Sequence, residues 1–368
     1  MQGSAVVIGA GIGGLAAARA LTQHGWTVSI LERAPALPTI GTTLGIWPAA
    51  MRALDAVGAG DAARARAGRL SDEAAATAGL RTPAGRTLLT TAGPSGLCLV
   101  SRPHLLAVLA EGLSISFGEV VEDPNDALAA ADVVVGADGA FSRTRDAMFG
   151  ARFPARPLGA VAWRGTVAGT AAEYGETWAP GALFGITPTG RDATNWYACV
   201  RAGRRYPAPQ LPHLHHFFGS WHAGVQAVLA RIGELDVLHH ELVETPLLPT
   251  YVTEATALVG DAAHAMGPFL GRGACEALVD GVVLAGCLSD STTVPDALAR
   301  YDAARRRTTQ RLVRASRLTG RLAMMGTGST PRNAALAAAG GLVARTSRLI
   351  TSARRATTQA STRRHRTT

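Results

Sequence analysis

A glycine-rich segment late in the chain, Gly260–Gly281, has the residue types of a ligand-binding loop. It reads GDAAHAMGPFLGRGACEALVDG, with an aspartate near its start, a proline, and two glycines directly before a helix-like stretch. A loop of this kind at a helix N-terminus offers unpaired backbone N–H groups to an anion. Glycines also leave room for a phosphate or a flat ring. The segment therefore predicts a binding site built from backbone.

The N-terminal residues 4–33 predict a β-α-β unit. Apolar runs over 5–8 and 27–31 are typical of buried strands, and the segment 13–23 between them has the composition of a helix. The turn that joins the first strand to the helix is rich in glycine. Dinucleotide-binding folds place the cofactor pyrophosphate at this turn.

The glycines of this turn have the spacing G-x-G-x-x-G, at Gly9, Gly11 and Gly14. The first permits the tight turn, the second lets the backbone approach a pyrophosphate, and the third lets the helix pack closely on the strand. Glu32 closes the second strand, where a carboxylate can accept hydrogen bonds from ribose hydroxyls. Together these features predict a dinucleotide site.

The middle of the chain predicts a β-rich unit. Residues 156–250 contain short apolar runs with turns between them, and a helical insert lies around 213–232. An earlier hairpin within 71–98 turns at 83–85. From residue 301 onward the pattern is helical and basic.

Three motifs follow one another along the chain: Gly9-x-Gly11-x-x-Gly14, then Gly136-Ala137-Asp138-Gly139 with Ser142 and Arg145, then Gly260-Asp261-Ala262-Ala263-His264 with Pro268 and Gly271-Arg272-Gly273. In this order and at these separations, the chain over about residues 4–320 resembles the single-component FAD-dependent aromatic monooxygenases. That group contains the p-hydroxybenzoate and salicylate hydroxylases. Residues 41–62 and 301–313 are also similar to segments of this family.

The resemblance implies an α/β fold in which a discontinuous, Rossmann-like FAD-binding domain carries an inserted β-rich substrate domain. The FAD-binding domain would comprise residues 1–70, 99–155 and 251–325. The substrate domain would comprise 71–98 and 156–250. A helical, basic C-terminal tail, 326–368, would follow.

The resemblance also assigns roles to individual residues. The first glycines would hold the FAD pyrophosphate and Glu32 the adenosine ribose, and Arg102 would contact the phosphate or ribityl region. Asp138 would serve both FAD and the nicotinamide cofactor, and Asp261 would bond a ribityl hydroxyl. The late loop would cradle the flavin ring, with Arg272 at a position where Gln is common. The implied cofactor-binding residues are Gly9, Gly11, Gly13, Gly14, Glu32, Arg33, Arg102, Asp138, Gly139, Asp261, Pro268, Gly271, Arg272 and Gly273.

Three residues on the expected strands of the substrate domain are candidate substrate contacts: Trp163, Arg164 and Tyr197. Aromatic residues on strands are more often ordinary core. The family's substrate lies on the sheet face turned to the flavin, so residues on that face remain candidates. His264 could act as a general base, although its place in the turn favours a role in stabilising the loop.

The implied reaction is hydroxylation or epoxidation of an electron-rich small molecule, aromatic or phenolic. NAD(P)H would reduce FAD, O2 would form a C4a-hydroperoxide, and its distal oxygen would pass to the substrate. An FAD-dependent reductase or dehydrogenase without oxygen transfer is the alternative. A non-enzymatic flavin-binding protein fits the sequence less well. A halogenase is excluded because the chain has no lysine and no WxWxIP sequence.

Charge is divided unevenly along the chain, whose formal net charge is +9. Residues 1–304 carry 21 Arg and all 27 acidic residues, a balance of −6, whereas 305–368 carry the other 15 Arg and no acid. This division argues against specific nucleic-acid binding by the whole protein. We expect residues 301–322 to pack as a helix with Leu312 and Leu318 facing inward, and the last ~15 residues to be disordered. The tail could contact anionic surfaces at low salt.

The remaining composition favours a cytoplasmic protein. The four cysteines form no CxxC pair and no zinc spacing, which is typical of reduced thiols. No apolar run approaches the ~18 residues of a membrane span, and no signal peptide is recognisable. The histidines of 213–222 fit one helix face poorly, so we expect no metal site.

Overall fold

The computed structural model describes residues 1–68, 78–90, 97–189 and 192–339. In chain order its helices, strands and 3-10 turns are β1 (Ser4–Ile8), α1 (Ile12–Gln23), β2 (Thr27–Glu32), β3 (Thr43–Ile46), α2 (Pro48–Ala56), α3 (Gly60–Ala65), β4 (Gly79–Arg81), β5 (Thr87–Thr90), β6 (Cys98–Ser101), α5 (Arg102–Ala110), β7 (Ile115–Phe117), α6 (Pro124–Leu128), β8 (Val133–Gly136), α7 (Arg143–Phe149), β9 (Arg156–Ala168), β10 (Gly175–Ala179), β11 (Ala182–Thr189), β12 (Ala193–Arg201), α8 (Leu211–Phe218), α9 (Ala223–Leu229), η1 (Glu234–Asp236), β13 (Leu238–Glu244), β14 (Thr256–Leu258), α10 (Asp261–His264), η2 (Pro268–Leu270), α11 (Gly273–Ser289) and α12 (Val294–Ala323). Residues 329–339 are also helical.

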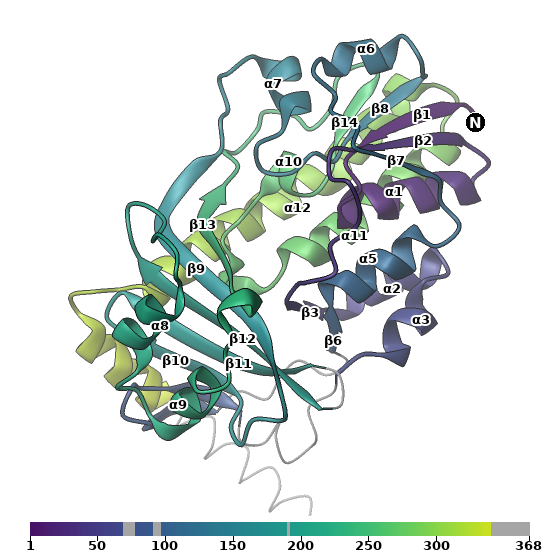
Figure 1. Ribbon diagram of the computed structural model, residues 1–368. Coiled ribbons are helices and arrows are strands. Elements are labelled where there is room, and N and C mark those ends of the chain that lie inside the picture. Colours follow the sequence, from purple (N-terminus) through teal and green to yellow (C-terminus); the bar gives the residue numbers. More distant parts are fainter. Residues whose placement is uncertain (69–77, 91–96, 190–191, 340–368) are drawn as a thin grey trace, which may run out of the picture.

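The first motif and the late loop meet at a parallel sheet of five strands, in the order β14-β8-β1-β2-β7. Strands β1, β8 and β14 come from widely separated parts of the chain, and each is followed by a glycine turn. Because the carboxyl ends of parallel strands meet at one edge of a sheet, the three glycine motifs converge there (Figure 1). The expected strand, helix and strand of residues 4–33 are confirmed within one residue at each end.

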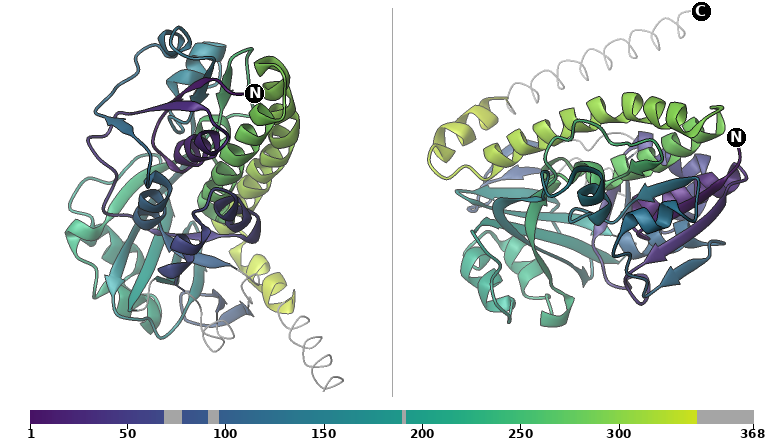
Figure 2. Two further views of the ribbon diagram at one scale, coloured as in Figure 1. Left: turned by 90° about the vertical axis from the view of Figure 1, so that its right-hand side faces the viewer. Right: turned by 90° about the horizontal axis from the view of Figure 1, so that it is seen from above.

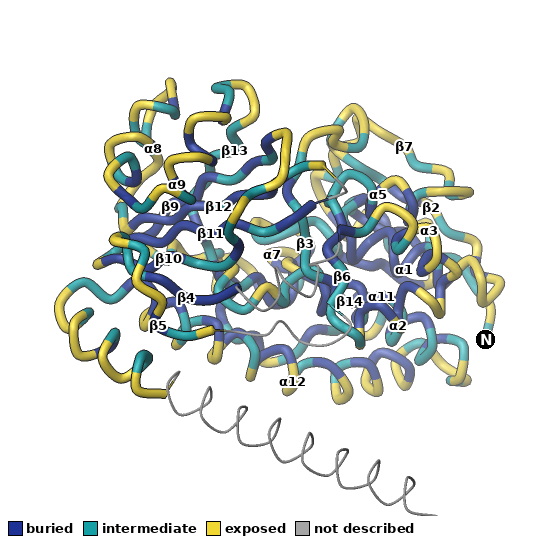
Figure 3. Tube along the Cα trace, turned by 90° about the horizontal axis from the view of Figure 1, so that it is seen from below, coloured by how far each residue is buried: buried dark blue, intermediate teal, exposed yellow. Residues whose placement is uncertain are grey.

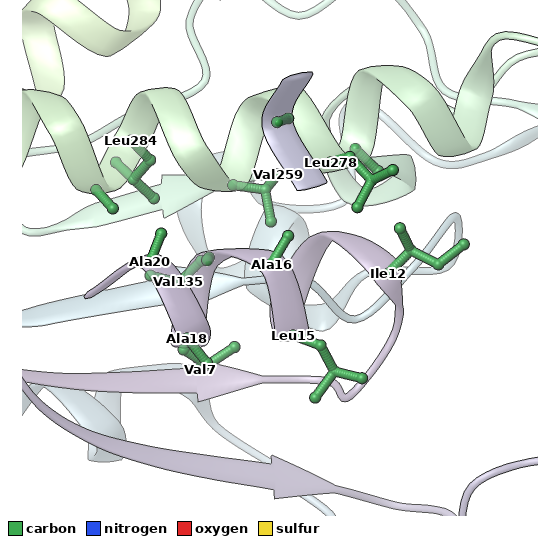
Figure 4. Close-up of a cluster of buried hydrophobic side chains, with 14 of the residues drawn as sticks. Val7, Ile12, Leu15, Ala16, Ala18, Ala20, Val135, Val259, Leu278 and Leu284 are labelled. Carbon is green, nitrogen blue, oxygen red and sulfur yellow. The ribbon is translucent and has the colours of Figure 1, made fainter. Parts of the chain in front are cut away.

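Helices α1 and α11 pack against each other beside this sheet. A Cβ on Gly281 would lie 2.5 Å from the backbone nitrogen of Ala17, so only glycine permits this approach. In Figure 4, Ala16 and Ala20 point toward Leu278 and Leu284 of α11, and these four residues are buried. The contact fixes the N-termini of both helices relative to the strands that precede them.

The second sheet has seven strands, in the order β13-β9-β12-β11-β10-β4-β5. Its neighbours are antiparallel except for β10 and β4. The expected hairpin with its turn at 83–85 provides β4 and β5. Helices α8 and α9 cover one face, against Trp163, Phe184 and Trp196. The opposite face packs partly against residues 323–337. The seven-stranded sheet therefore lies between α8 and α9 on one side and this segment on the other.

Helix α12 runs alongside both sheets (Figure 2). Buried and exposed stretches alternate along it (Figure 3), and its buried side includes Val313, Ser316, Gly320 and Ala323. The expectation that Leu318 faces inward is wrong: 69 % of its surface is exposed. Helical periodicity explains the error, because Leu318 lies two residues from both Ser316 and Gly320 and so falls on the outer side.

The segment after α12 packs more closely than its composition suggests. The helix at residues 329–339 places Leu336 and Ala337 against the seven-stranded sheet's core cluster, and Arg332 is only 6 % exposed. The expected disorder of the last ~15 residues falls within 340–368, outside the described residues. No helix in the described part of the chain is long and apolar enough to cross a membrane.

Candidate active site

The N-terminal glycine turn combines two tightly packed glycines with one open glycine. A Cβ on Gly14 would lie 2.0 Å from the carbonyl oxygen of Gly9. Gly9 itself has φ 107°, and a Cβ there would lie 2.5 Å from the carbonyl oxygen of Ala137. A Cβ on Gly11, by contrast, would meet nothing within 4 Å. Gly9 and Gly14 therefore build the turn, and Gly11 leaves an open face at the N-terminus of α1.

Glu32 is fixed beside this turn at the end of β2. Its carboxylate accepts hydrogen bonds from the backbone nitrogens of Ala10 (2.7 Å) and Ala34 (2.8 Å). The side chain remains partly exposed, and each carboxylate oxygen keeps a free lone pair. Glu32 is thus held at the mouth of the glycine turn, where we expected a ribose. The neighbouring Arg33 is exposed.

The second motif forms a turn that is capped by its own aspartate. Asp138 accepts a hydrogen bond from the Ser142 hydroxyl at 2.5 Å and two more from the backbone and hydroxyl of Thr144. Its carboxylate is therefore engaged at the start of α7 rather than free for a cofactor. Gly139 has φ 83°, and a Cβ there would meet nothing within 4 Å. This turn therefore offers open backbone at Gly139 rather than a free Asp138 carboxylate.

Arg145 ties the second motif to the late loop. Its guanidinium donates to the carbonyl oxygens of Ala140 and Ala262, although its Nε is buried without a partner. Burial lowers the pKa of this arginine, and Asp146 and Asp138 partly offset that effect. The bond to Ala262 holds the turn after β8 against α10, so the two loops keep a fixed spacing.

Asp261, the first residue of α10, is the least satisfied carboxylate of the site. Its side chain is exposed, and no group in the part of the chain that the structure describes donates a hydrogen bond to it. Burial nevertheless raises its pKa, with His264, Arg102 and Arg164 acting in the opposite direction. The Asp261 carboxylate therefore has charged neighbours but no hydrogen-bond donor among the described residues. Arg102 of α5 and Arg164 of β9 thus act on Asp261 from other elements.

The rest of the late loop also presents open backbone. Gly271 has φ 60°, and a Cβ on either Gly271 or Gly273 would meet nothing within 4 Å. Pro268 is exposed at the start of η2. The Arg272 side chain turns away from the glycines: it lies 4.9 Å over the Trp47 ring and donates to Glu276 at 2.6 Å. The loop thus exposes N–H groups at the start of α11.

A buried ionic network supports the loop from behind. His264 Nε2 contacts Asp280 Oδ2 at 2.5 Å, Asp280 Oδ1 accepts from Arg305 Nε at 2.7 Å, and Arg305 also donates to Glu276 at 2.7 Å. Asp280 Oδ2 accepts from the backbone nitrogen of Gly260 as well. His264 is therefore a structural residue of the turn, and this geometry does not support a role for it as a general base.

The three candidate substrate contacts separate onto two faces of the seven-stranded sheet. Arg164 and Tyr197 are directly paired and share the face opposite α8 and α9. Trp163 is fully buried on the α8 and α9 face, where it donates to Gln210 and stacks on His239. Adjacent residues in a strand point in opposite directions. The expectation for Trp163 is therefore corrected, and Arg164 and Tyr197 remain candidates.

Two residues on the Arg164 face were missed by sequence reasoning. His240 is paired with Ala162 on this face, and burial, followed by Arg164, lowers its pKa to about 4, so it is neutral near pH 7. Glu176 accepts a hydrogen bond from Tyr197. Neither belongs to a motif. Only the strand register, which the sequence did not supply, places them beside Arg164.

These residues fit FAD. The open backbone of Gly11 at the start of α1 suits a pyrophosphate, and the unpaired carboxylate of Asp261 suits a sugar-alcohol hydroxyl. Gly271 and Gly273 leave space and N–H groups for a flat ring. Arg164, whose Nε is buried without a partner among the described residues, interacts electrostatically with Asp261 from the second sheet. Among the described residues, no group of three or more His, Cys, Asp or Glu side chains could hold a metal ion.

Comparison with known proteins identifies the same features. The family described as FAD binding domain matches residues 119–316, and that described as NAD(P)-binding Rossmann-like domain matches 7–39. The aurachin C monooxygenase/isomerase of Stigmatella aurantiaca is 31 % identical over 82 % of this chain and 84 % of its own length. The FAD-dependent urate hydroxylase of Klebsiella pneumoniae is 29 % identical over 82 % and 85 %.

Solved structures agree in fold. The crystal structure of Klebsiella pneumoniae HpxO complexed with FAD and uric acid superposes with a TM-score of 0.77, at 23 % identity, over 90 % of this chain and 91 % of that one. The expected α/β architecture is thereby confirmed, and the match to the FAD binding domain confirms the FAD cofactor. The chain belongs to the family of FAD-dependent aromatic monooxygenases.

Proposed function

We propose that this enzyme uses NAD(P)H and O2 to hydroxylate or epoxidise a small, electron-rich aromatic or phenolic molecule. The observation that carries the proposal is the Asp261 carboxylate, which has no donor among the described residues, lies at the sheet edge where the three glycine motifs converge, and is influenced by Arg164 of the second sheet. When bound, FAD supplies the chemistry of accepting electrons from NAD(P)H and delivering one oxygen atom of O2.

The chain's own residues bind and orient. Open backbone at Gly11 holds the pyrophosphate, Glu32 the ribose, and Asp261 the ribityl chain. Arg102, at the start of α5, adds positive charge that acts on the Asp261 carboxylate. Donors at the N-terminus of α11 stabilise negative charge at the edge of the ring.

The five-stranded and seven-stranded sheets belong to units with different roles. We propose that residues 1–70, 99–155 and 251–325 hold the cofactor, and that 71–98 and 156–250 bind the substrate. The Arg164 face lies toward the cofactor side, so substrate bound on it would be shielded from bulk water. We also propose a cytoplasmic location, because all four cysteines are free thiols, as is usual in a reducing compartment.

The test uses the purified holoprotein and a panel suggested by the relatives. Urate, 6-hydroxynicotinate, 3-amino-4-hydroxybenzoate, salicylate and 2-heptyl-4(1H)-quinolone are each incubated with NADH or NADPH in air. We expect at least one to accelerate NAD(P)H oxidation, with matching O2 consumption and a product that has gained one oxygen atom, accompanied by loss of CO2 where the hydroxylated ring carbon carried a carboxylate. Substrate conversion without O2 consumption would instead identify a dehydrogenase or reductase.

A further inference from the structure

One row of directly paired residues crosses the Arg164 face of the seven-stranded sheet. Arg164 of β9 is paired with Tyr197 of β12, Tyr197 with Gly185 of β11, and Gly185 with Glu176 of β10. Directly opposite residues place their side chains on the same face. The row therefore begins with a cation that interacts electrostatically with Asp261 and ends with a carboxylate.

Gly185 allows Tyr197 to reach Glu176. A Cβ on Gly185 would lie 2.0 Å from Cζ of Tyr197, so the phenol ring lies flat over the glycine. From there the Tyr197 hydroxyl donates to Glu176 Oε1 at 2.6 Å, and Trp178 Nε1 donates to Glu176 Oε2 at 2.7 Å. Both carboxylate oxygens are engaged, and the single hydroxyl hydrogen of Tyr197 is committed to one of them.

The surroundings of the Tyr197 hydroxyl keep it protonated. Tyr197 is partly exposed, yet burial, together with the charge of Glu176, raises its pKa well above its ordinary value. A phenol held neutral, with its hydrogen donated elsewhere, can only accept further hydrogen bonds. At the other end of the row, Arg164 can only donate.

We propose that Glu176 is a positioning residue for substrate selection. By taking the hydroxyl hydrogen of Tyr197, it turns the phenol oxygen into an acceptor, so that the site prefers aromatic molecules with an N–H or O–H donor at that position. Arg164 then donates hydrogen bonds to a carbonyl or anionic oxygen on the other side of the same molecule. This inference rests on the proposed function and specifies its substrate class.

The test compares ligands that differ only in the donor. Dissociation constants are measured from changes in flavin absorbance of the holoprotein, for 2-heptyl-4(1H)-quinolone against 2-heptylchromone, in which oxygen replaces N–H, and for salicylate against 2-fluorobenzoate. In the wild type we expect the donor form to bind ~10-fold more tightly, the ratio for one hydrogen bond. Tyr197→Phe should bring that ratio close to one.

Glu176→Leu distinguishes a role in ligand selection from a purely structural role, because it should change the binding of the two ligands in opposite directions. With the carboxylate gone, the Tyr197 hydroxyl is free to donate, so chromone binding should strengthen while quinolone binding weakens. Thr177→Val is the matched control, because Thr177 lies next to Glu176 on β10 but contacts His222 on the other face. It should leave the ratio unchanged.

The inference and the proposed function fail in different ways. A wild-type protein that binds FAD and oxidises NAD(P)H but shows no preference for either donor form overturns the inference alone. So does a preference that survives both Tyr197→Phe and Glu176→Leu. A protein that does not bind FAD contradicts the proposed function itself.

Discussion

His264 Nε2 and Asp280 Oδ2 lie 2.5 Å apart, and both side chains are almost completely inaccessible to water. Asp280 also holds the backbone nitrogen of Gly260 and the side chain of Arg305. One carboxylate thus joins the late glycine loop to helices α11 and α12. Because the loop lies directly in front of this pair, the ionisation of the pair is coupled to the shape of the cofactor site.

The first prediction concerns pH. Burial alone would lower the pKa of His264, but Asp280 outweighs it and the pKa is raised. Burial alone would raise the pKa of Asp280, but His264 and Arg305 lower it. Stabilisation from His264 is therefore complete below its unfolded pKa of about 6.5 and is lost as pH rises through the folded value. Stabilisation from Asp280 is present above about pH 3.9 and is lost as pH falls through its lowered value.

The measurement is the free energy of unfolding of the apoprotein from urea titrations between pH 5 and 9. We expect it to decline on the alkaline side, and we expect His264→Gln to remove that decline. Asp280→Asn should cost about 3–5 kcal/mol, because it leaves buried cationic groups uncompensated. Asp55→Asn, which breaks an exposed pair with Arg64, is the control and should change little. An alkaline decline that persists in His264→Gln would assign it to another group.

The second prediction separates glycines that build the turn from glycines that face the cofactor. Gly14→Ala places a Cβ 2.0 Å from the Gly9 carbonyl oxygen and should cost ~3 kcal/mol or more in folding. Gly11 has φ −75° and open space around it, so Gly11→Ala should cost no more than about 1 kcal/mol. The same methyl group, however, occupies the space of the pyrophosphate. Gly11→Ala should therefore fold normally and lose FAD, which apoprotein melting and flavin content can separate. A Gly11→Ala protein that retains full FAD affinity would place the pyrophosphate elsewhere.

The third prediction concerns Asp261, whose carboxylate has no donor among the described residues. Asp261→Ala should weaken FAD binding by ~1–3 kcal/mol, the range for one charge-assisted hydrogen bond. Fluorescence titration of apoprotein with FAD measures this loss. Asp146→Ala is a matched control, because Asp146 is also an exposed aspartate in the first turn of a short helix, α7. Equal affinities in wild type and Asp261→Ala would show that the late loop does not contact the ribityl chain.

The parts of the site that could be predicted from sequence are those carried by backbone. Glycine spacing constrains conformation directly, so Gly9, Gly11 and Gly14 could be assigned distinct roles from their order alone. The side of a strand on which a residue lies depends instead on register across the sheet. The sequence alone therefore could not separate Trp163 from Arg164 and Tyr197 by sheet face, and Glu176 was missed. Sequence reasoning also missed the buried network around Asp280, because Asp280 and Arg305 lie 25 positions apart and meet only through helix packing.

The last prediction concerns the C-terminal segment. Arg332 donates to the carbonyl oxygens of Leu322 and Ala323, which close α12, and lies 5.4 Å over the Trp178 ring. Arg332→Ala should cost about 1–3 kcal/mol, because the carbonyl groups lose their donor. Arg321→Ala, at an exposed position in the last turn of α12, is the control.

Two truncations then locate the boundary of the folded body. A chain that ends at Thr327 loses the helix at 329–339 and exposes Trp178, which itself holds Glu176. We expect this chain to melt at lower temperature and to lose substrate turnover. A chain that ends at Ser352 keeps every described residue, so its FAD content and turnover should match those of the full chain. If it loses either, residues 353–368 belong to the functional fold, and the basic segment is more than a solvated extension.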